Sequence, residues 1–103
     1  MTQLKQKAVV LSPKDNVATA LTNLKAGDTL ELEVGGRPQT IKLNSDVPFG
    51  HKLSLSRIDP NLPVIKYGEV IGISTDLIEP GDYVHTHNVV SARGRGDLEG
   101  GVK

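Results

Sequence analysis

The chain has 103 residues, about one domain, and its twelve basic side chains balance twelve acidic ones. This balance argues against a nucleic-acid binder, which normally shows a basic excess or a basic stripe. No apolar run approaches the roughly 20 residues of a membrane-spanning helix, and without cysteine there is no disulfide framework or thiolate nucleophile. Residues 1–7 are polar and lack the hydrophobic segment of a secretory signal, so we expect a cytoplasmic protein.

The first elements expected along the chain are a strand and a short helix. Residues 7–11 (KAVVL) predict the strand, and Pro13 ends it. Asp15 is placed as a helix N-cap rather than as a catalytic acid, and Gly27 as the residue that ends the helix. Four apolar residues between them recur at helical spacing: Val17, Ala20, Leu21 and Leu24. The pattern predicts one short helix near residues 16–25.

Beyond this segment the pattern indicates short strands joined by turns. Apolar and acidic residues alternate over residues 30–34, and a hairpin turn at residues 35–38 leads to a return strand. A second tight hairpin is centred on residues 66–69, where Glu69 is expected to be a solvated turn residue. Further strands are predicted around Leu53 and Leu55, over residues 64–67 and 70–74, and over residues 83–90. The fold class expected is all-β, with one short helix.

The end of the chain differs in composition from the rest. Residues 91–103 are rich in glycine and charge, so the expected organisation is a β domain over residues 1–90 and a flexible tail over 91–103. Arg93 and Arg95 lie in this tail between glycines. They could hold a carboxylate bidentately, and the alternative is that they are solvated.

A weak internal repetition supports the all-β prediction. Residues 24–30, 58–64 and 78–84 share an apolar residue, a turn and the start of a strand. Pro80 and Gly81 suit the two central positions of a type II turn. Reuse of the same turn chemistry is sufficient to explain the repetition without an internal duplication.

The three histidines are the most informative polar residues. His85 and His87 lie two apart on a predicted strand, so their side chains should face the same way, about 6.7 Å apart. His51 follows a turn that could bring it toward them, and neighbouring Lys52 could hold a carboxylate. His85 and His87 could bind a metal ion or act in acid–base catalysis. The alternatives are surface or hydrogen-bonded structural histidines, and an ordinary exposed lysine. No P-loop, dinucleotide-binding glycine pattern or Ser-His-Asp spacing is present.

Four segments resemble the SAF domain of altronate and galactarate dehydratases, in matching order and separation over about residues 8–90. They are residues 15–21 (DNVATAL), 47–52 (VPFGHK), 66–72 (KYGEVIG) and 84–88 (VHTHN). Residues 93–98 (RGRGDL) are similar to the end of separately encoded small subunits of this family. The resemblance implies a β-clip fold, a folded-over set of β-hairpins. The sequence departs from the family at residues 59–63 (DPNLP), where such domains usually carry a glycine turn.

The resemblance also implies a function. It predicts a small subunit of a sugar-acid hydro-lyase, inactive alone, whose larger catalytic chain carries most of the active site. The expected contributions are His51, His85 and His87 as catalytic groups, with substrate contacts from Lys52 and from the two tail arginines. A divalent metal, Fe²⁺ or similar, would be shared with the partner chain and bound in part by His85 and His87. Two alternatives remain: a small subunit of a sulfolactate sulfo-lyase, and a non-catalytic ligand-binding or assembly module.

Overall fold

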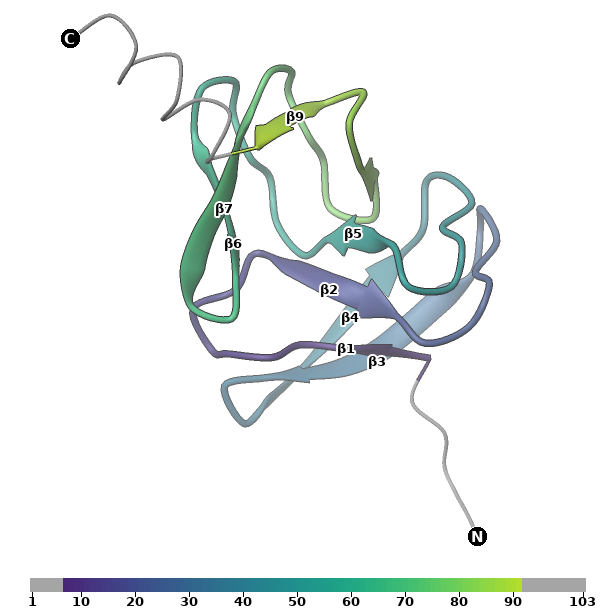
Figure 1. Cartoon of the computed structure of the whole chain (residues 1–103). Helices are drawn as coiled ribbons and strands as arrows, with labels where there is room; N and C mark the ends of the chain where they lie inside the picture. Colours follow the sequence, from purple (N-terminus) through teal and green to yellow (C-terminus); the bar gives the residue numbers. More distant parts are fainter. Residues whose placement is uncertain (1–6, 92–103) are drawn as a thin grey trace, which may run out of the picture.

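The computed structural model describes residues 7–91, and these form nine β-strands and no helix (Figure 1). The strands are β1 (Ala8–Val9), β2 (Val17–Ala20), β3 (Thr29–Val34), β4 (Arg37–Lys42), β5 (Lys52–Ser54), β6 (Pro63–Lys66), β7 (Glu69–Ser74), β8 (Tyr83–Val84) and β9 (Val89–Ser91). The all-β prediction is confirmed, and the architecture agrees with a β-clip of short hairpins. In this part of the chain no helix is long and apolar enough to cross a membrane.

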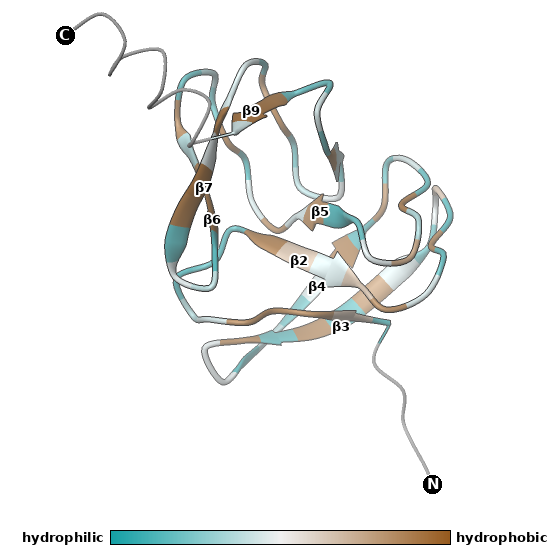
Figure 2. Ribbon diagram, viewed as in Figure 1, coloured by the Kyte–Doolittle hydropathy of each residue, from teal (hydrophilic) through white to brown (hydrophobic). Residues whose placement is uncertain are grey.

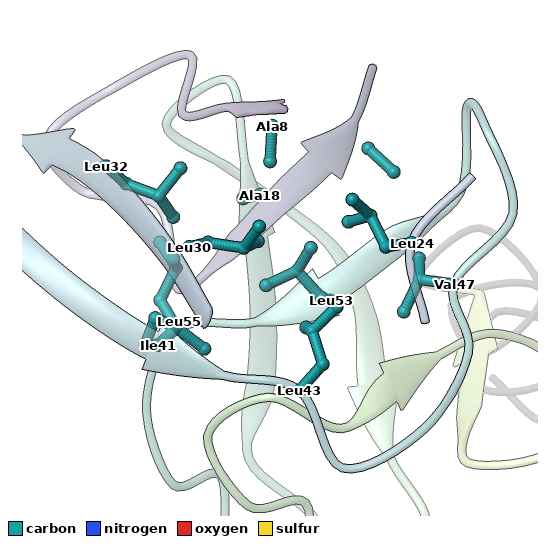
Figure 3. Close-up of a cluster of buried hydrophobic side chains, with 11 residues drawn as sticks. Ala8, Ala18, Leu24, Leu30, Leu32, Ile41, Leu43, Val47, Leu53 and Leu55 are labelled. Atoms are coloured by element: carbon teal, nitrogen blue, oxygen red, sulfur yellow. The ribbon is translucent and has the colours of Figure 1, made fainter. Parts of the chain in front are cut away.

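The strands form three antiparallel sheets, with a four-stranded sheet in the middle. Its order is β1-β2-β5-β8, and the other two sheets are the β3–β4 hairpin and β6-β7-β9. Side chains on one face of the middle sheet, such as Ala18 and Leu53, pack with Leu30 and Ile41 of the hairpin (Figure 3). Its opposite face meets the third sheet through a second core cluster: Val17, Ile58, Val64, Ile78 and Val84. The middle sheet is therefore buried on both faces.

The helix predicted near residues 16–25 is wrong, because residues 17–20 form β2 at the centre of the middle sheet. Asp15 does not cap a helix. Its Oδ2 accepts hydrogen bonds from the backbone N–H groups of Leu11 and Ser12, and its Oδ1 accepts one from Gly68, 53 residues away. The apolar spacing looked helical because β2 is buried on both faces, so its side chains show no strand alternation.

The two predicted hairpins are confirmed, each with a two-residue turn. Along β3, leucines and charged residues alternate between buried and exposed, and Figure 2 shows the matching change of colour. Gly35 and Gly36 both have positive φ, which matches the twist of the β3–β4 hairpin. Tyr67 and Gly68 make the equivalent turn between β6 and β7, with φ of 59° and 73°.

One turn motif occurs four times, at residues 25–28, 48–51, 59–62 and 79–82. Each copy has a hydrogen bond from the N–H of its fourth residue to the carbonyl of its first, and a positive φ at its third. The residue before each copy belongs to an isolated bridge, Leu24 with Val47 or Ile58 with Ile78. At residues 59–63, where the sequence departs from the family pattern, Asn61 takes the left-handed conformation with φ of 72°. The substitution therefore preserves the turn.

Candidate functional site

Four aromatic side chains gather at one end of the middle sheet: His51, Tyr83, His85 and His87. The ring of His51 lies 4.7 Å from that of His85 and 5.7 Å from that of Tyr83, measured between centroids. The rings of Tyr83 and His85 are stacked, with centroids 5.5 Å apart and 7° between their planes. The ring of His87 is also 5.5 Å from that of Tyr83, but the two planes are tilted by 40°. The structure therefore gathers the three histidines singled out in the sequence around Tyr83, which contacts the ring of each of them.

Strand register explains this gathering. β5 and β8 are antiparallel neighbours, with Lys52 opposite Val84. Continuing this register by one residue places His51, just before β5, opposite His85, just after β8. The turn at residues 48–51 closes through the His51 N–H and the carbonyl of Pro48, 3.0 Å apart, and so fixes where His51 enters the sheet.

The strand predicted over residues 83–90 is wrong, because a turn at residues 85–88 separates β8 from β9. Asn88 holds this turn. Its backbone N–H donates to the carbonyl of His85 at 3.1 Å, its Oδ1 accepts the N–H of His85 at 2.9 Å, and its Nδ2 donates to the carbonyl of Tyr83 at 2.8 Å. His85 and His87 are exposed on this turn, while Asn88 is buried. Strand alternation was therefore the wrong reason for expecting the two histidines near each other.

The shortest polar contact in the cluster joins the Tyr83 hydroxyl to Nδ1 of His51, at 2.7 Å. The histidine tautomer decides which of the two atoms donates. A half-buried imidazole bonded to a phenol is a pair through which a proton can move, and imidazole takes part in acid–base chemistry near neutral pH. Tyr83 and Asn88 were not among the predicted site residues. Both flank the His-x-His segment, and Asn88 is also the last residue of the resembling segment 84–88.

Lys52 lies next to this cluster and lines a pocket of about 220 Å³. His85 lines the same pocket and so belongs to both the cluster and the pocket. Partial burial lowers the pKa of the Lys52 ammonium below its usual value, and the positive charge of Lys66 lowers it further. That Lys52 holds a carboxylate and that the histidines act in catalysis stay predictions.

Two of the predicted site residues, Arg93 and Arg95, lie outside the described residues, as does the predicted tail from residue 92 onward. Within residues 7–91, no group of three or more histidine, aspartate or glutamate side chains could hold a metal ion. This part of the chain therefore does not fit the predicted divalent metal as a complete site, and we derive no catalytic step through one.

The sequence of this chain matches the family model described as the altronate/galactarate dehydratase SAF domain over residues 6–92. This match covers all the described residues. The chain belongs to this family. The expectation drawn from the four resembling segments is confirmed.

Individual relatives show where such a domain occurs. The chain is similar to an altronate dehydratase of Escherichia coli, 45% identical over 72% of this chain, and to one of Bacillus subtilis, 31% identical over 78%. It spans only 14% and 15% of those proteins. A (2R)-sulfolactate sulfo-lyase subunit alpha of Paracoccus pantotrophus is 43% identical over 48% of this chain, and that match covers 73% of the subunit. The SAF domain thus corresponds to a small part of the dehydratases and to most of that subunit.

Proposed function

We propose that the chain is a small subunit of a sugar-acid hydro-lyase, and that its aromatic cluster forms one wall of an active site shared with a larger catalytic chain. The observation that supports this most is the cluster itself, in which three imidazoles and a phenol meet at one end of the domain. The likeness to a protein named as a subunit, over 73% of its length, also favours a separate small chain.

The proposed reaction has two proton transfers. A base removes the proton beside the substrate carboxylate, and an acid protonates the β-hydroxyl as its carbon–oxygen bond breaks, which releases water and leaves an enol. The enol then becomes a 2-keto-3-deoxy acid. Imidazole can serve in either role. We assign the proton uptake to the bonded pair of His51 and Tyr83, because the phenol can pass a proton to or from Nδ1. The exposed His85 and His87 then face the leaving hydroxyl.

Two features of the proposal depend on the partner chain. A six-carbon acid has about 13 non-hydrogen atoms, and a ligand site normally buries most of its ligand, so the partner must supply the remaining walls. A divalent metal would take its other ligands from the partner, with His85 and His87 as this chain's contribution. We also place the complex in the cytoplasm.

Reconstitution tests the proposal. The chain is co-expressed with a larger chain similar to the rest of altronate dehydratase, and the purified complex is assayed with altronate, galactarate and sulfolactate. We expect 2-keto-3-deoxy acid from the complex and none from the small chain alone. Turnover by the small chain at about 1 s⁻¹ or more would contradict the subunit assignment. Sulfite release from sulfolactate would instead support a sulfo-lyase, and full activity of the larger chain alone would support an assembly role.

A further inference from the structure

The pocket beside the aromatic cluster lies between the middle sheet and the third sheet. Lys52 comes from β5 and Val84 from β8, while Ile71 and Val89 come from β7 and β9. His85 adds an imidazole from the turn after β8. Thr86 and Ser91 complete the described lining, so the pocket combines one ammonium, one imidazole and three aliphatic side chains with two hydroxyl-bearing residues.

Among residues 7–91, no acidic side chain forms an ion pair with Lys52. None of the described residues that line the pocket is acidic, and within residues 7–91 the single ion pair joins Arg57 to Asp59 elsewhere. Partial burial opposes protonation of Lys52, and the like charge of Lys66 opposes it further. A partly desolvated cation beside a second cation is a site at which an anion gains favourable interactions with both.

The walls and the size of the pocket restrict the anion. Hydroxyl groups of a polyol chain that lie against Ile71, Val84 and Val89 would lose their water partners. Among the described lining residues, Thr86 and Ser91 alone carry hydroxyls, and these are too few to replace the water around a whole polyol. A cavity of about 150 Å³ holds one benzene molecule, so a pocket of about 220 Å³ takes roughly nine non-hydrogen atoms. A whole six-carbon sugar acid exceeds this size. One ammonium with one imidazole also suits a single negative charge better than a phosphate dianion.

We propose that this pocket binds a small aliphatic monocarboxylate, with the carboxylate on Lys52 and His85 and the aliphatic part against Ile71, Val84 and Val89. The inference concerns the chain alone and does not depend on the proposed lyase activity. It can fail while reconstitution succeeds, and it can succeed while reconstitution fails.

Isobutyrate is a suitable probe because it has one carboxylate and a branched aliphatic group. Titration of the full chain, followed by amide and histidine NMR shifts, should show saturable binding at about 1 mM. The shifts should centre on His85, Thr86 and Val89. Isobutyramide has the same shape without the charge, and it should bind at least about tenfold more weakly. Gluconate and inorganic phosphate should also bind more weakly than isobutyrate.

Two lysine variants localise the charge that matters. Lys52→Met should abolish saturable isobutyrate binding, and Lys66→Met, which removes a charge that does not line the pocket, should weaken binding only a few fold. Equal binding of isobutyramide and isobutyrate would overturn the proposal, and so would undiminished binding by Lys52→Met. Tighter binding of gluconate or phosphate would overturn the ligand class. The ligand comparisons use the unaltered chain, so they decide the matter even where a variant fails to fold.

Discussion

Alanine at Gly81 should destabilise the domain much more than alanine at Gly27, although the two glycines have φ of 89° and 91° in equivalent turns. Both substitutions place an L-residue in the left-handed region, which costs about 1–2 kcal/mol. At Gly27 a new Cβ meets nothing within 4 Å. At Gly81 the Cβ would lie 2.1 Å from the carbonyl oxygen of Lys42, so the backbone must move.

The movement at Gly81 also costs hydrogen bonds. The Gly81 N–H donates to the carbonyl of Ser54 at 2.8 Å, and its carbonyl accepts the N–H of Asn44 at 3.0 Å. Loss of both, at about 1 kcal/mol each, adds to the conformational cost and gives about 3–4 kcal/mol in total. Because this turn leads directly into β8, a shift there also displaces Tyr83.

Thermal and urea unfolding followed by circular dichroism would measure the difference. Each 1 kcal/mol lowers Tm by about 4–8 °C in a domain of this size. We therefore expect Gly81→Ala to lose about 10 °C more than Gly27→Ala. Equal losses of Tm would refute the reasoning, because the two positions differ mainly in the space available to the Cβ.

The other predictions concern single polar groups. Thr19→Val should raise the free energy of unfolding by about 1 kcal/mol in urea titrations, because the buried Thr19 Oγ1 has no hydrogen-bond partner among residues 7–91; a loss of stability would mean that the hydroxyl is satisfied. Asn88→Ala should lower the free energy of unfolding by about 2–3 kcal/mol, because two side-chain hydrogen bonds hold the turn at residues 85–88. Asn23→Ala is the control and should cost less, because Asn23 is exposed and its side chain accepts one hydrogen bond. Lys52→Met should raise Tm at neutral pH, because a pKa lowered in the folded state means that folding disfavours the charged ammonium. In the parent chain, Lys52 destabilises the fold less as pH rises from its lowered pKa toward 10.5, because it loses its proton there. The stability advantage of Lys52→Met should therefore shrink over that range, and an advantage that grew would contradict a lowered pKa.

Strand periodicity located the strands that have one exposed face, such as β3, and failed for β2, which has none. The alternation of Leu30 and Leu32 with glutamates located β3, and turn residues located both hairpins. β2 was taken for a helix because Val17 and Ala18 are buried on opposite faces of a central strand. Asp15 was predicted to cap that helix, whereas its carboxylate accepts a hydrogen bond from Gly68, 53 residues away. Such long-range contacts have no local sequence pattern.

The candidate site was predictable in part. Histidine count and spacing singled out the three residues that meet in space, but the turn held by Asn88, not strand alternation, sets the positions of His85 and His87. Tyr83 was missed because a tyrosine on a predicted strand looks like a core residue. Its hydrogen bond to His51 depends on the pairing of β5 with β8, which the sequence alone does not reveal.

Turnover and thermal stability of the reconstituted complex, measured on the same samples, test the shared active site most directly. We expect His85→Ala and His87→Ala each to lower kcat by at least about 100-fold, some 2.7 kcal/mol of transition-state stabilisation, and Tyr83→Phe by about tenfold, with Tm nearly unchanged. Glu69→Gln, at the exposed start of β7, is the matched control and should retain full activity. Near-normal turnover in the His85, His87 and Tyr83 variants would contradict a catalytic role for the cluster and leave the domain a scaffold.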